Sequence, residues 1–226
     1  MWTRRQVAKT IDHAALKPFL TDADIRAACE LGKKYGVASV CVRASDVALA
    51  AQELTGSEVL PSTVIGFPHG AHRPEVKALE ARLAIEDGAR ELDMVMNIGK
   101  FLSGDDVYVQ RDIEAVVAEA RRHPGVLVKV ILETCHLTQE QIAKACQLAQ
   151  AAGADFVKTS TGYGDDGATP EAVAVMIRTV GGSMGIKPSG GIRTYEGACR
   201  YLDMGVQRLG VAATKDVLEN APLAGD

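Results

Sequence analysis

The stretch "GVLVKVILETCHLTQEQIAKACQLAQAAGADFVKTS", residues 125–160, contains two strand-like apolar runs with a helical pattern between them. The runs cover 125–133 and 155–160. The helical pattern at 138–153 begins with a threonine suited to an N-cap and ends with a glycine suited to a helix C-terminus. A strand, a helix and a second strand in this order predict a right-handed crossover between two parallel strands.

The same alternation continues along the whole chain. Strands are expected at 9–14, 38–43, 58–67, 91–97, 125–133, 155–160, 184–190 and 206–212. Helices are expected at 21–36, 45–54, 74–88, 105–123, 138–153, 169–181 and 194–205. The expected N-caps are Thr21, Ser45, Thr138, Thr169 and Thr194, and the glycines expected to end helices are Gly36, Gly88, Gly153 and Gly205.

Eight such units predict an α/β fold, a (β/α)8 TIM barrel that forms a single domain over residues 1–226. The strand candidates are nearly continuous in Val, Ile, Leu and Met, as strands buried on both faces are. An open doubly wound sheet is the competing fold, but no G-x-G-x-x-G follows an early strand. In a barrel, polar residues at the C-terminal ends of strands belong to the mouth of the active site.

Composition limits the classes of partner. The 226 residues are 47% hydrophobic with a net charge of −4, and no dense run of Lys and Arg predicts binding of nucleic acid. No apolar stretch is long enough to cross a membrane. The five cysteines are scattered without CxxC spacing, so we expect neither a disulfide framework nor a zinc site, and a reducing cytoplasm is favoured. A small molecule is the expected partner.

Four ionisable residues lie inside otherwise apolar strand candidates, namely Asp93, Lys129, Lys158 and Lys187. Such a group is unfavourable in the apolar core unless it is paired with an opposite charge or takes part in the chemistry of a site. Each could therefore belong to a buried ion pair that only supports the fold, or to a reactive site. Lys129 is expected to point into the barrel and to pair with Asp93 or with Glu133, itself a possible second carboxylate at the mouth.

Lys158 and Lys187 lie one strand–helix unit apart, so they should end adjacent parallel strands. Two ammonium groups so close repel each other, and one of them should lose its proton. An uncharged lysine is a nucleophile that can form a Schiff base with a carbonyl compound. Asp93, expected three strands earlier and across the barrel lumen, could move protons and balance the charge of the lysine pair.

Glycines mark the other side of the predicted mouth. Gly190 and Gly191 follow the strand that carries Lys187, and Gly210 ends the last strand just before a short helix. Loops after the seventh and eighth strands of such barrels commonly bind phosphate through backbone N–H groups. The loop after Lys158 could add the N–H groups of Thr161 and Gly162. Tight turns that bind no ligand are the alternative interpretation.

Seven segments in order resemble the deoxyribose-phosphate aldolase family across almost the whole chain. They are "TIDHAALKP", "YGVASVCV", "TVIGFPHGAH", "EVKALEARLAIEDGARELDMVMNIG", "VKVILETCHLT", "AGADFVKTSTGYGDDGAT" and "GIKPSGGIRTYE". These class I aldolases interconvert 2-deoxy-D-ribose 5-phosphate with acetaldehyde and D-glyceraldehyde 3-phosphate. A Schiff-base aldolase needs no metal, and we expect no cofactor. Barrels of this type are usually dimers or tetramers, so we expect a homo-oligomer.

The resemblance also implies roles for named residues. Lys158 matches the Schiff-base lysine, Lys187 the neighbour that lowers its pKa, and Asp93 the proton relay that acts with water. The further mouth positions are Asp12 and Cys41, and the substrate and phosphate side matches Gly162, Gly190, Gly191 and Gly210. Two alternatives stay open: a Schiff-base aldolase for a non-phosphorylated aldehyde, and a non-catalytic barrel that binds sugar phosphates.

The chain departs from the family pattern at three places. Ala212 and Ala213 stand where relatives usually have two serines, so two side-chain donors to phosphate are missing. Arg43 occupies a strand end where it could reach a phosphate or lie in solvent. The chain ends in "ENAPLAGD" without the terminal tyrosine of some relatives, so we expect no proton transfer by the tail.

Two pairs of residues tempt other interpretations. His69 and His72 could suggest a metal site, but no third ligand is near in sequence. Cys135 and His136 resemble a catalytic pair, yet neighbouring residues at a strand end point apart.

Overall fold

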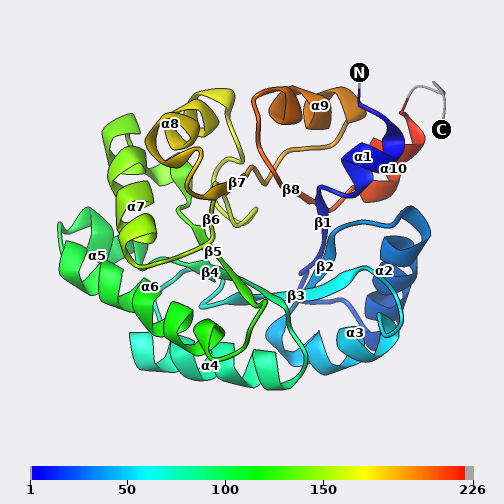
Figure 1. Ribbon diagram of the computed structural model, residues 1–226, viewed down its shortest axis with the longest axis horizontal. Coiled ribbons are helices and arrows are strands. Elements are labelled where there is room, and N and C mark those ends of the chain that lie inside the picture. Colours follow the sequence, from blue (N-terminus) through cyan, green and yellow to red (C-terminus); the bar gives the residue numbers. More distant parts are fainter. Residues whose placement is uncertain (1, 222–226) are drawn as a thin grey trace.

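The computed structural model describes residues 2–221, in which strands and helices alternate around a central barrel (Figure 1). The strands are β1 Ile11–Ala15, β2 Ser39–Val42, β3 Leu60–Ile65, β4 Glu91–Val95, β5 Leu127–Ile131, β6 Phe156–Lys158, β7 Gly185–Lys187 and β8 Leu209–Val211. The main outer helices are α2 Asp22–Tyr35, α3 Val47–Glu53, α4 Pro74–Glu86, α6 Asp106–Arg121, α7 Gln139–Ala151, α8 Pro170–Val180 and α9 Tyr195–Asp203. Shorter elements are α1 Arg4–Ala8, η1 Ala44–Asp46, α5 Ile98–Leu102, η2 Thr134–His136 and α10 Thr214–Glu219.

The eight strands form one sheet in the order β7-β6-β5-β4-β3-β2-β1-β8, and every neighbouring pair is parallel. A single bridge between Ser189 and Gly210 joins the two ends of this order, where the N–H of Gly210 donates to the carbonyl of Pro188 at 2.8 Å. The sheet therefore curls into a nearly closed barrel. The predicted barrel is confirmed, and the open sheet is excluded.

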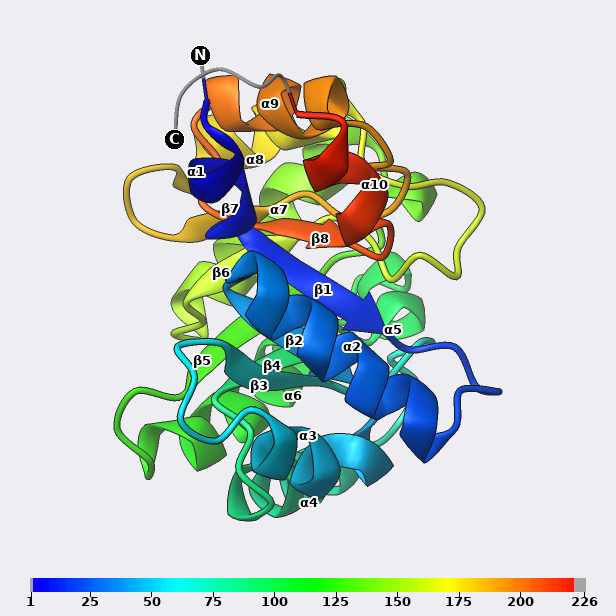
Figure 2. The same ribbon diagram turned by 90° about the vertical axis from the view of Figure 1, so that its right-hand side faces the viewer.

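The hydrophobic core lies between the barrel wall and the surrounding helices. Outward-facing strand residues such as Leu92, Val128 and Val157 are fully buried in it. Figure 2 shows β8 beside β1, with α2 and α10 on the outside of the wall. No helix within residues 2–221 is both long and apolar enough to cross a membrane.

Four of the five expected N-caps are present. Thr21, Thr138, Thr169 and Thr194 each accept a hydrogen bond from the third residue of their helix. Ser45 is not a cap, because the turn η1 precedes α3 and the N-cap position falls on Asp46.

The four glycines expected to end helices have positive φ angles, a backbone conformation that favours glycine. The sequence did not predict the short helices α1 and α5. The tail beyond residue 221, which lacks the terminal tyrosine, lies outside the described residues.

Candidate active site

A cluster of seven charged side chains fills the lumen of the barrel, and almost all of their surface is buried. They are Asp12, Glu91, Asp93, Lys129, Lys158, Lys187 and Arg208. Charged groups are buried in this way only when they are paired. We call this group the lumen cluster.

Asp93 lies at the centre of the lumen cluster. Its Oδ2 is 2.7 Å from the Nζ of Lys158 and 2.7 Å from the Nζ of Lys187, and its Oδ1 is 2.8 Å from the Nζ of Lys129. Because Lys158 and Lys187 share one oxygen, their nitrogens lie within twice that distance of each other. The register of β6 and β7 also pairs the two lysines, as expected. Asp93, however, lies on β4, two strands from β6 rather than three.

The two lysines differ in proton affinity. Burial lowers the pKa of Lys158 below its ordinary 10.5, Asp93 opposes this, and the positive charge of Lys187 lowers the pKa further. Burial also acts to lower the pKa of Lys187, but Asp12 and Asp93 together raise it above the ordinary value. Lys158 is thus the member of the pair that loses its proton first. The expectation that the neighbouring cation is the main cause was wrong, because burial is the larger one.

Asp12 and Lys129 complete the inner part of the cluster. The Oδ2 of Asp12 is 2.5 Å from the Nζ of Lys187 and 3.3 Å from the Nζ of Lys129. Lys129 also pairs with Glu91 at 2.6 Å, and despite burial these carboxylates raise its pKa well above the ordinary value. The predicted pairing of Lys129 with Asp93 is confirmed, while the alternative pairing with Glu133 is wrong.

Glu133 instead holds the loop that follows β6. It accepts hydrogen bonds from the backbone N–H of Thr161 at 3.1 Å and from the hydroxyl of Thr161. The N–H of Thr161 is therefore already used, and the expectation that it could bind phosphate was wrong. Gly162, next to it, has a φ of 83°.

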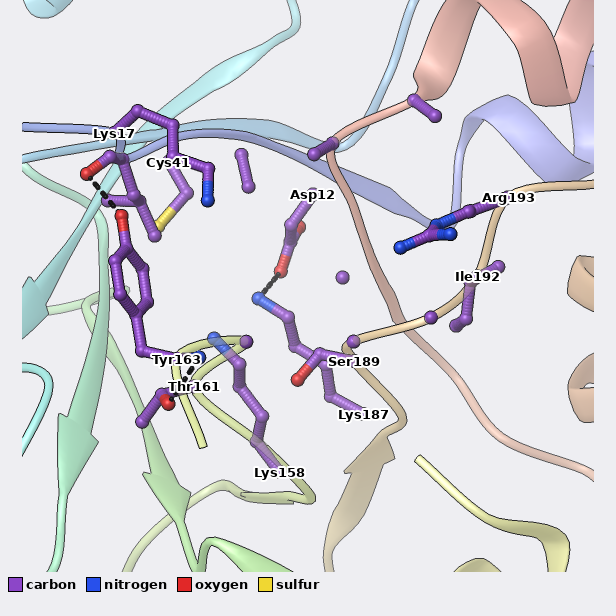
Figure 3. A pocket seen from close by; sticks show the side chains of 18 of the residues that line it. Asp12, Lys17, Cys41, Lys158, Thr161, Tyr163, Lys187, Ser189, Ile192 and Arg193 are labelled. Atoms are coloured by element: carbon purple, nitrogen blue, oxygen red, sulfur yellow. Dashed lines mark hydrogen bonds and ion pairs between the residues drawn. The ribbon is translucent and has the colours of Figure 1, made fainter. Parts of the chain in front are cut away.

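A cavity of about 370 Å³ opens above the two lysines at the C-terminal ends of the strands (Figure 3). Nine of the ten predicted site residues line it: Asp12, Cys41, Lys158, Thr161, Gly162, Lys187, Gly190, Gly191 and Gly210. Asp93 does not line the cavity, because it lies fully buried beneath the lysines. The structure thus brings nine of the predicted site residues together around one cavity, as the sequence predicted.

Gly190 and Gly191 form one wall of the cavity, with φ angles of 81° and 82°. Arg193 and Ala213 extend this wall, and Figure 3 shows the guanidinium of Arg193 beside the cavity. Gly210 was expected to offer its N–H to phosphate, but this N–H already donates to the carbonyl of Pro188. A Cβ at Gly210 would lie 2.5 Å from the Cβ of Ser189, so glycine is required here for close packing.

The opposite wall contains Tyr163, which the sequence argument did not single out. Its hydroxyl donates to the carbonyl of Leu16 at 2.9 Å, and its ring stands edge-on to Phe67 with the centroids 5.4 Å apart. The Nζ of Lys17 lies 5.0 Å from the centroid of the same ring. Tyr163 therefore connects the loop after β6 with the loop after β1. Its place in the quoted motif "VKTSTGYG" was the available signal.

Arg43 does not face the cavity. Its guanidinium pairs with Asp46 at 2.6 Å and donates to the carbonyls of Pro18 and Leu20. It therefore fixes the loop after β1 while 25% of its side-chain surface stays exposed, so of the two expectations only the phosphate contact was wrong. Within residues 2–221, no group of three or more His, Cys, Asp and Glu side chains converges as a metal site would.

Residues 6–213 match the family model described as DeoC/LacD family aldolase. The chain belongs to this family. It is 51% identical to the deoxyribose-phosphate aldolase of Thermococcus gammatolerans over 95% of this chain and 96% of that protein. It is also 51% identical to the deoxyribose-phosphate aldolase of a Geobacillus species, over 94% and 95% of the two chains.

Solved aldolase structures share the fold. The chain resembles the tetrameric deoxyribose phosphate aldolase of Aeropyrum pernix with a TM-score of 0.89 and 32% identity, over 96% of this chain and 91% of that one. The family resemblance that the sequence motifs predicted is confirmed.

Proposed function

We propose that the chain is a class I aldolase. It cleaves 2-deoxy-D-ribose 5-phosphate to D-glyceraldehyde 3-phosphate and acetaldehyde, and it catalyses the reverse addition. The observation that carries the proposal is the amine of Lys158, which lies at the base of the cavity with a lowered pKa and touches Asp93. An uncharged amine in such a place is suited to covalent attack on an aldehyde.

The reaction starts when the lone pair of Lys158 attacks C1 of the open-chain sugar. Loss of water from the adduct gives an iminium ion, which withdraws electrons from C2. The C3 hydroxyl then loses its proton and the C2–C3 bond breaks, so that C3 becomes the aldehyde carbon of D-glyceraldehyde 3-phosphate. The electron pair of the broken bond forms an enamine between C1 and C2. Protonation of C2 and hydrolysis release acetaldehyde and restore Lys158.

Asp93 and Lys187 serve the proton transfers. Asp93 lies out of reach of the cavity, so it exchanges protons through the two lysine nitrogens that it contacts and through water. Lys187 remains an ammonium group that lines the cavity and disfavours a second positive charge on Lys158. Asp12 holds Lys187 in place. Burial raises the pKa of the Cys41 thiol, so this neighbour stays uncharged.

The phosphate of the substrate binds at the glycine-rich wall of the cavity. The N–H groups of Gly162, Gly190 and Gly191 are the proposed donors, with the guanidinium of Arg193 beside them. Ala212 and Ala213 line the same wall and provide no hydroxyl groups. A hydrogen bond to a charged group contributes about 1.5–3 kcal/mol, so each missing donor lowers affinity roughly tenfold or more.

Trapping of the covalent intermediate tests the proposal. Borohydride added with acetaldehyde should reduce the iminium and leave an ethyl group on the peptide that contains Lys158, as mass mapping would show. Lys158→Met should abolish this label. A label on another lysine, or none at all, would refute the assignment and favour a non-catalytic sugar-phosphate-binding barrel.

A second candidate is an aldolase of the same type that prefers a non-phosphorylated aldehyde. The alanines at 212 and 213 favour it, because they remove two phosphate donors. The test compares kcat/KM for deoxyribose and for its 5-phosphate in the wild type and in Ala212→Ser/Ala213→Ser. We expect the wild type to prefer the phosphate and the variant to increase that preference about a hundredfold, which is roughly tenfold for each restored donor. A wild type that prefers deoxyribose would support the second candidate.

We also propose a homo-oligomer, a dimer or tetramer, that works in the cytoplasm without nucleic acid or membrane. The tetrameric relative from Aeropyrum pernix supports an oligomer, and the five free cysteines support a reducing compartment. Light scattering of the purified protein should give two or four times the monomer mass, whereas the monomer mass would contradict the proposal.

A further inference from the structure

The charges of the lumen cluster do not balance when all its members are ionised. Four cations, including Arg208, face the three carboxylates of Asp12, Glu91 and Asp93. Loss of one proton from Lys158 leaves three positive and three negative charges. Because an uncompensated charge is strongly unfavourable in a buried site, the cluster as a whole favours an uncharged Lys158.

Arg208 lies at the opposite end of the barrel from the cavity. It directly precedes β8, and its main partner Glu91 is the first residue of β4, so both lie at the N-terminal ends of the strands. Its two terminal nitrogens contact the Glu91 carboxylate at 2.8 and 2.7 Å, and one of them contacts Asp12 at 2.5 Å. The guanidinium also lies over the ring of Phe156. Arg208 does not line the cavity, so it cannot touch the substrate.

Two continuous series of ion pairs connect Arg208 with Lys158. The first passes through Glu91 to Lys129 at 2.6 Å, from Lys129 to Asp93 at 2.8 Å, and from Asp93 to Lys158 at 2.7 Å. Every carboxylate in this series lies between two cations. A charge removed at Arg208 therefore changes the pairing of all the others.

The second series passes through Asp12. Asp12 contacts Lys187 at 2.5 Å, and Lys187 contacts the same oxygen of Asp93 as Lys158 does, at 2.7 Å. If Arg208 were absent, more of the negative charge of Asp12 would act on Lys187, which it already contacts at 2.5 Å. Lys187 would then neutralise less of Asp93, which could pair fully with a protonated Lys158.

We propose that Arg208 is a positioning residue for the aldolase reaction, whose positive charge at the N-terminal ends of the strands keeps Lys158 in its uncharged, nucleophilic form. The inference rests on the proposed Schiff-base role of Lys158. Under this proposal, the N-terminal ends of the strands, which do not contact the substrate, take part in the chemistry.

The remaining groups that face the lumen do not alter this charge count near neutral pH. β2 contributes Cys41, whose thiol is held neutral because burial raises its pKa, and Ser39, which donates to Asp12. β3 contributes Ser62, which bonds to Ser39. The other strands contribute the charged members already named. The titratable groups at the mouth, Glu133, Lys17, Arg193 and Asp216, lie outside the lumen cluster and are the same in every variant of the test, so they cancel from the comparison.

The test is the pH dependence of kcat/KM for cleavage of 2-deoxy-D-ribose 5-phosphate in charge variants. Arg208→Gln should move the acidic limb of the profile to higher pH by about one unit, the effect of one charge at roughly 10 Å in a medium of effective dielectric constant about 20. Activity at a pH below the limb should fall about tenfold and recover at alkaline pH. Glu91→Gln should move the limb in the opposite direction.

The double variant Arg208→Gln/Glu91→Gln restores the charge difference of the wild type, so its limb should return close to the original pH. Arg208→Lys keeps the charge and should keep the limb in place. The matched control is Arg121→Gln, because Arg121 also binds a carboxylate, Asp155, at 2.9 Å but lies outside the lumen. We expect the control to leave the profile unchanged.

Opposite shifts in the two single variants support the proposal, since a merely structural loss would lower activity without moving the limb. An unmoved limb in Arg208→Gln, or shifts in the same direction, would overturn it. If Arg208→Gln does not fold, an unmoved limb in Glu91→Gln overturns it as well. Acetaldehyde and borohydride labelling of the wild type separates the two claims: a missing label at Lys158 refutes the proposed function, whereas a label without pH shifts refutes only the role of Arg208.

Discussion

Lys158 and Lys187 are residues of the same type at paired positions of neighbouring strands, yet their pKa values move in opposite directions. The difference arises from their partners. Lys158 touches one carboxylate, that of Asp93, whereas Lys187 touches both Asp93 and Asp12. One additional carboxylate at 2.5 Å therefore decides which lysine is the nucleophile.

Replacement of Lys187 tests this asymmetry. In Lys187→Met, Lys158 would become the only lysine on its Asp93 oxygen, so its pKa should rise. The amine form exists above that pKa, so activity should fall at least about tenfold at neutral pH and partly recover at alkaline pH. The pH profile of deoxyribose 5-phosphate cleavage measures this change in activity. A profile of unchanged shape would show that Lys187 does not set the pKa of Lys158.

Single residues could be predicted from sequence where a charge interrupts an apolar strand. Asp93, Lys129, Lys158 and Lys187 were all found in this way. Glu91 and Arg208 were missed because they stand at strand beginnings, where charges usually meet solvent. Glu91 did carry a signal, since it lies two residues before Asp93 and so faces the same side of the strand. The order of the causes of a pKa shift could not be predicted, because it depends on burial.

Among the elements, α10 is attached to the barrel by a buried histidine. The Nδ1 of His13 on β1 lies 2.9 Å from the hydroxyl of Thr214, the first residue of α10. Burial lowers the pKa of His13 from 6.5 to about 4, although a backbone contact with Val211 opposes the shift. The folded chain therefore keeps this histidine neutral at pH values where the unfolded chain protonates it.

The stability of the fold should depend on pH through His13. Its contribution is complete above pH 6.5 and is lost as the pH falls toward 4, with a loss of about 2 kcal/mol by about pH 5. Urea unfolding at pH 7 and pH 5 should show this loss in the wild type and not in His13→Gln. The exposed-site variant His69→Gln should behave like the wild type, and equal losses in wild type and His13→Gln would disprove the link.

Most helices and strands could be predicted from apolar runs and capping residues. The wrong prediction at Ser45 and the missed helix α1 have local physical reasons. Ser45 was expected to cap a helix, but the carboxylate of Asp46 pairs with Arg43 and a 3-10 turn forms first. The helix α1 was missed because it has only five residues, and a capping box between Thr3 and Gln6 specifies it.

The barrel closes between β7 and β8. One bridge there brings Ser189 against Gly210 directly beside Lys187, and the carbonyl of Ile186 also accepts hydrogen bonds from the N–H groups of Gln207 and Arg208. The alternation of strands and helices predicted parallel strands with right-handed crossovers, and therefore the overall topology. The close packing of Ser189 against Gly210, where β7 meets β8, could not be predicted from sequence. That residues 1–226 form a single domain stays a prediction.

Gly210→Ala tests the importance of the closure. The added Cβ would lie 2.5 Å from the Cβ of Ser189 and 3.4 Å from the Cε of Lys187, so the seam must open. We expect a loss of about 1–3 kcal/mol in the free energy of unfolding, together with reduced aldolase activity. Gly99→Ala is the control, because its Cβ would meet nothing closer than 3.9 Å in the helix α5. Equal stability of the two variants would argue against a tight seam.

The mechanism depends on Lys158 losing its proton more readily than the other two lysines of the lumen cluster, Lys129 and Lys187. Carbon NMR of the lysine ε positions, assigned with Lys158→Met, measures this directly as the pH is raised. We expect the Lys158 signal to titrate below 10.5, the ordinary lysine value, while Lys129 and Lys187 remain protonated above it. A Lys158 signal that titrates at or above 10.5, or after that of Lys187, would contradict the account.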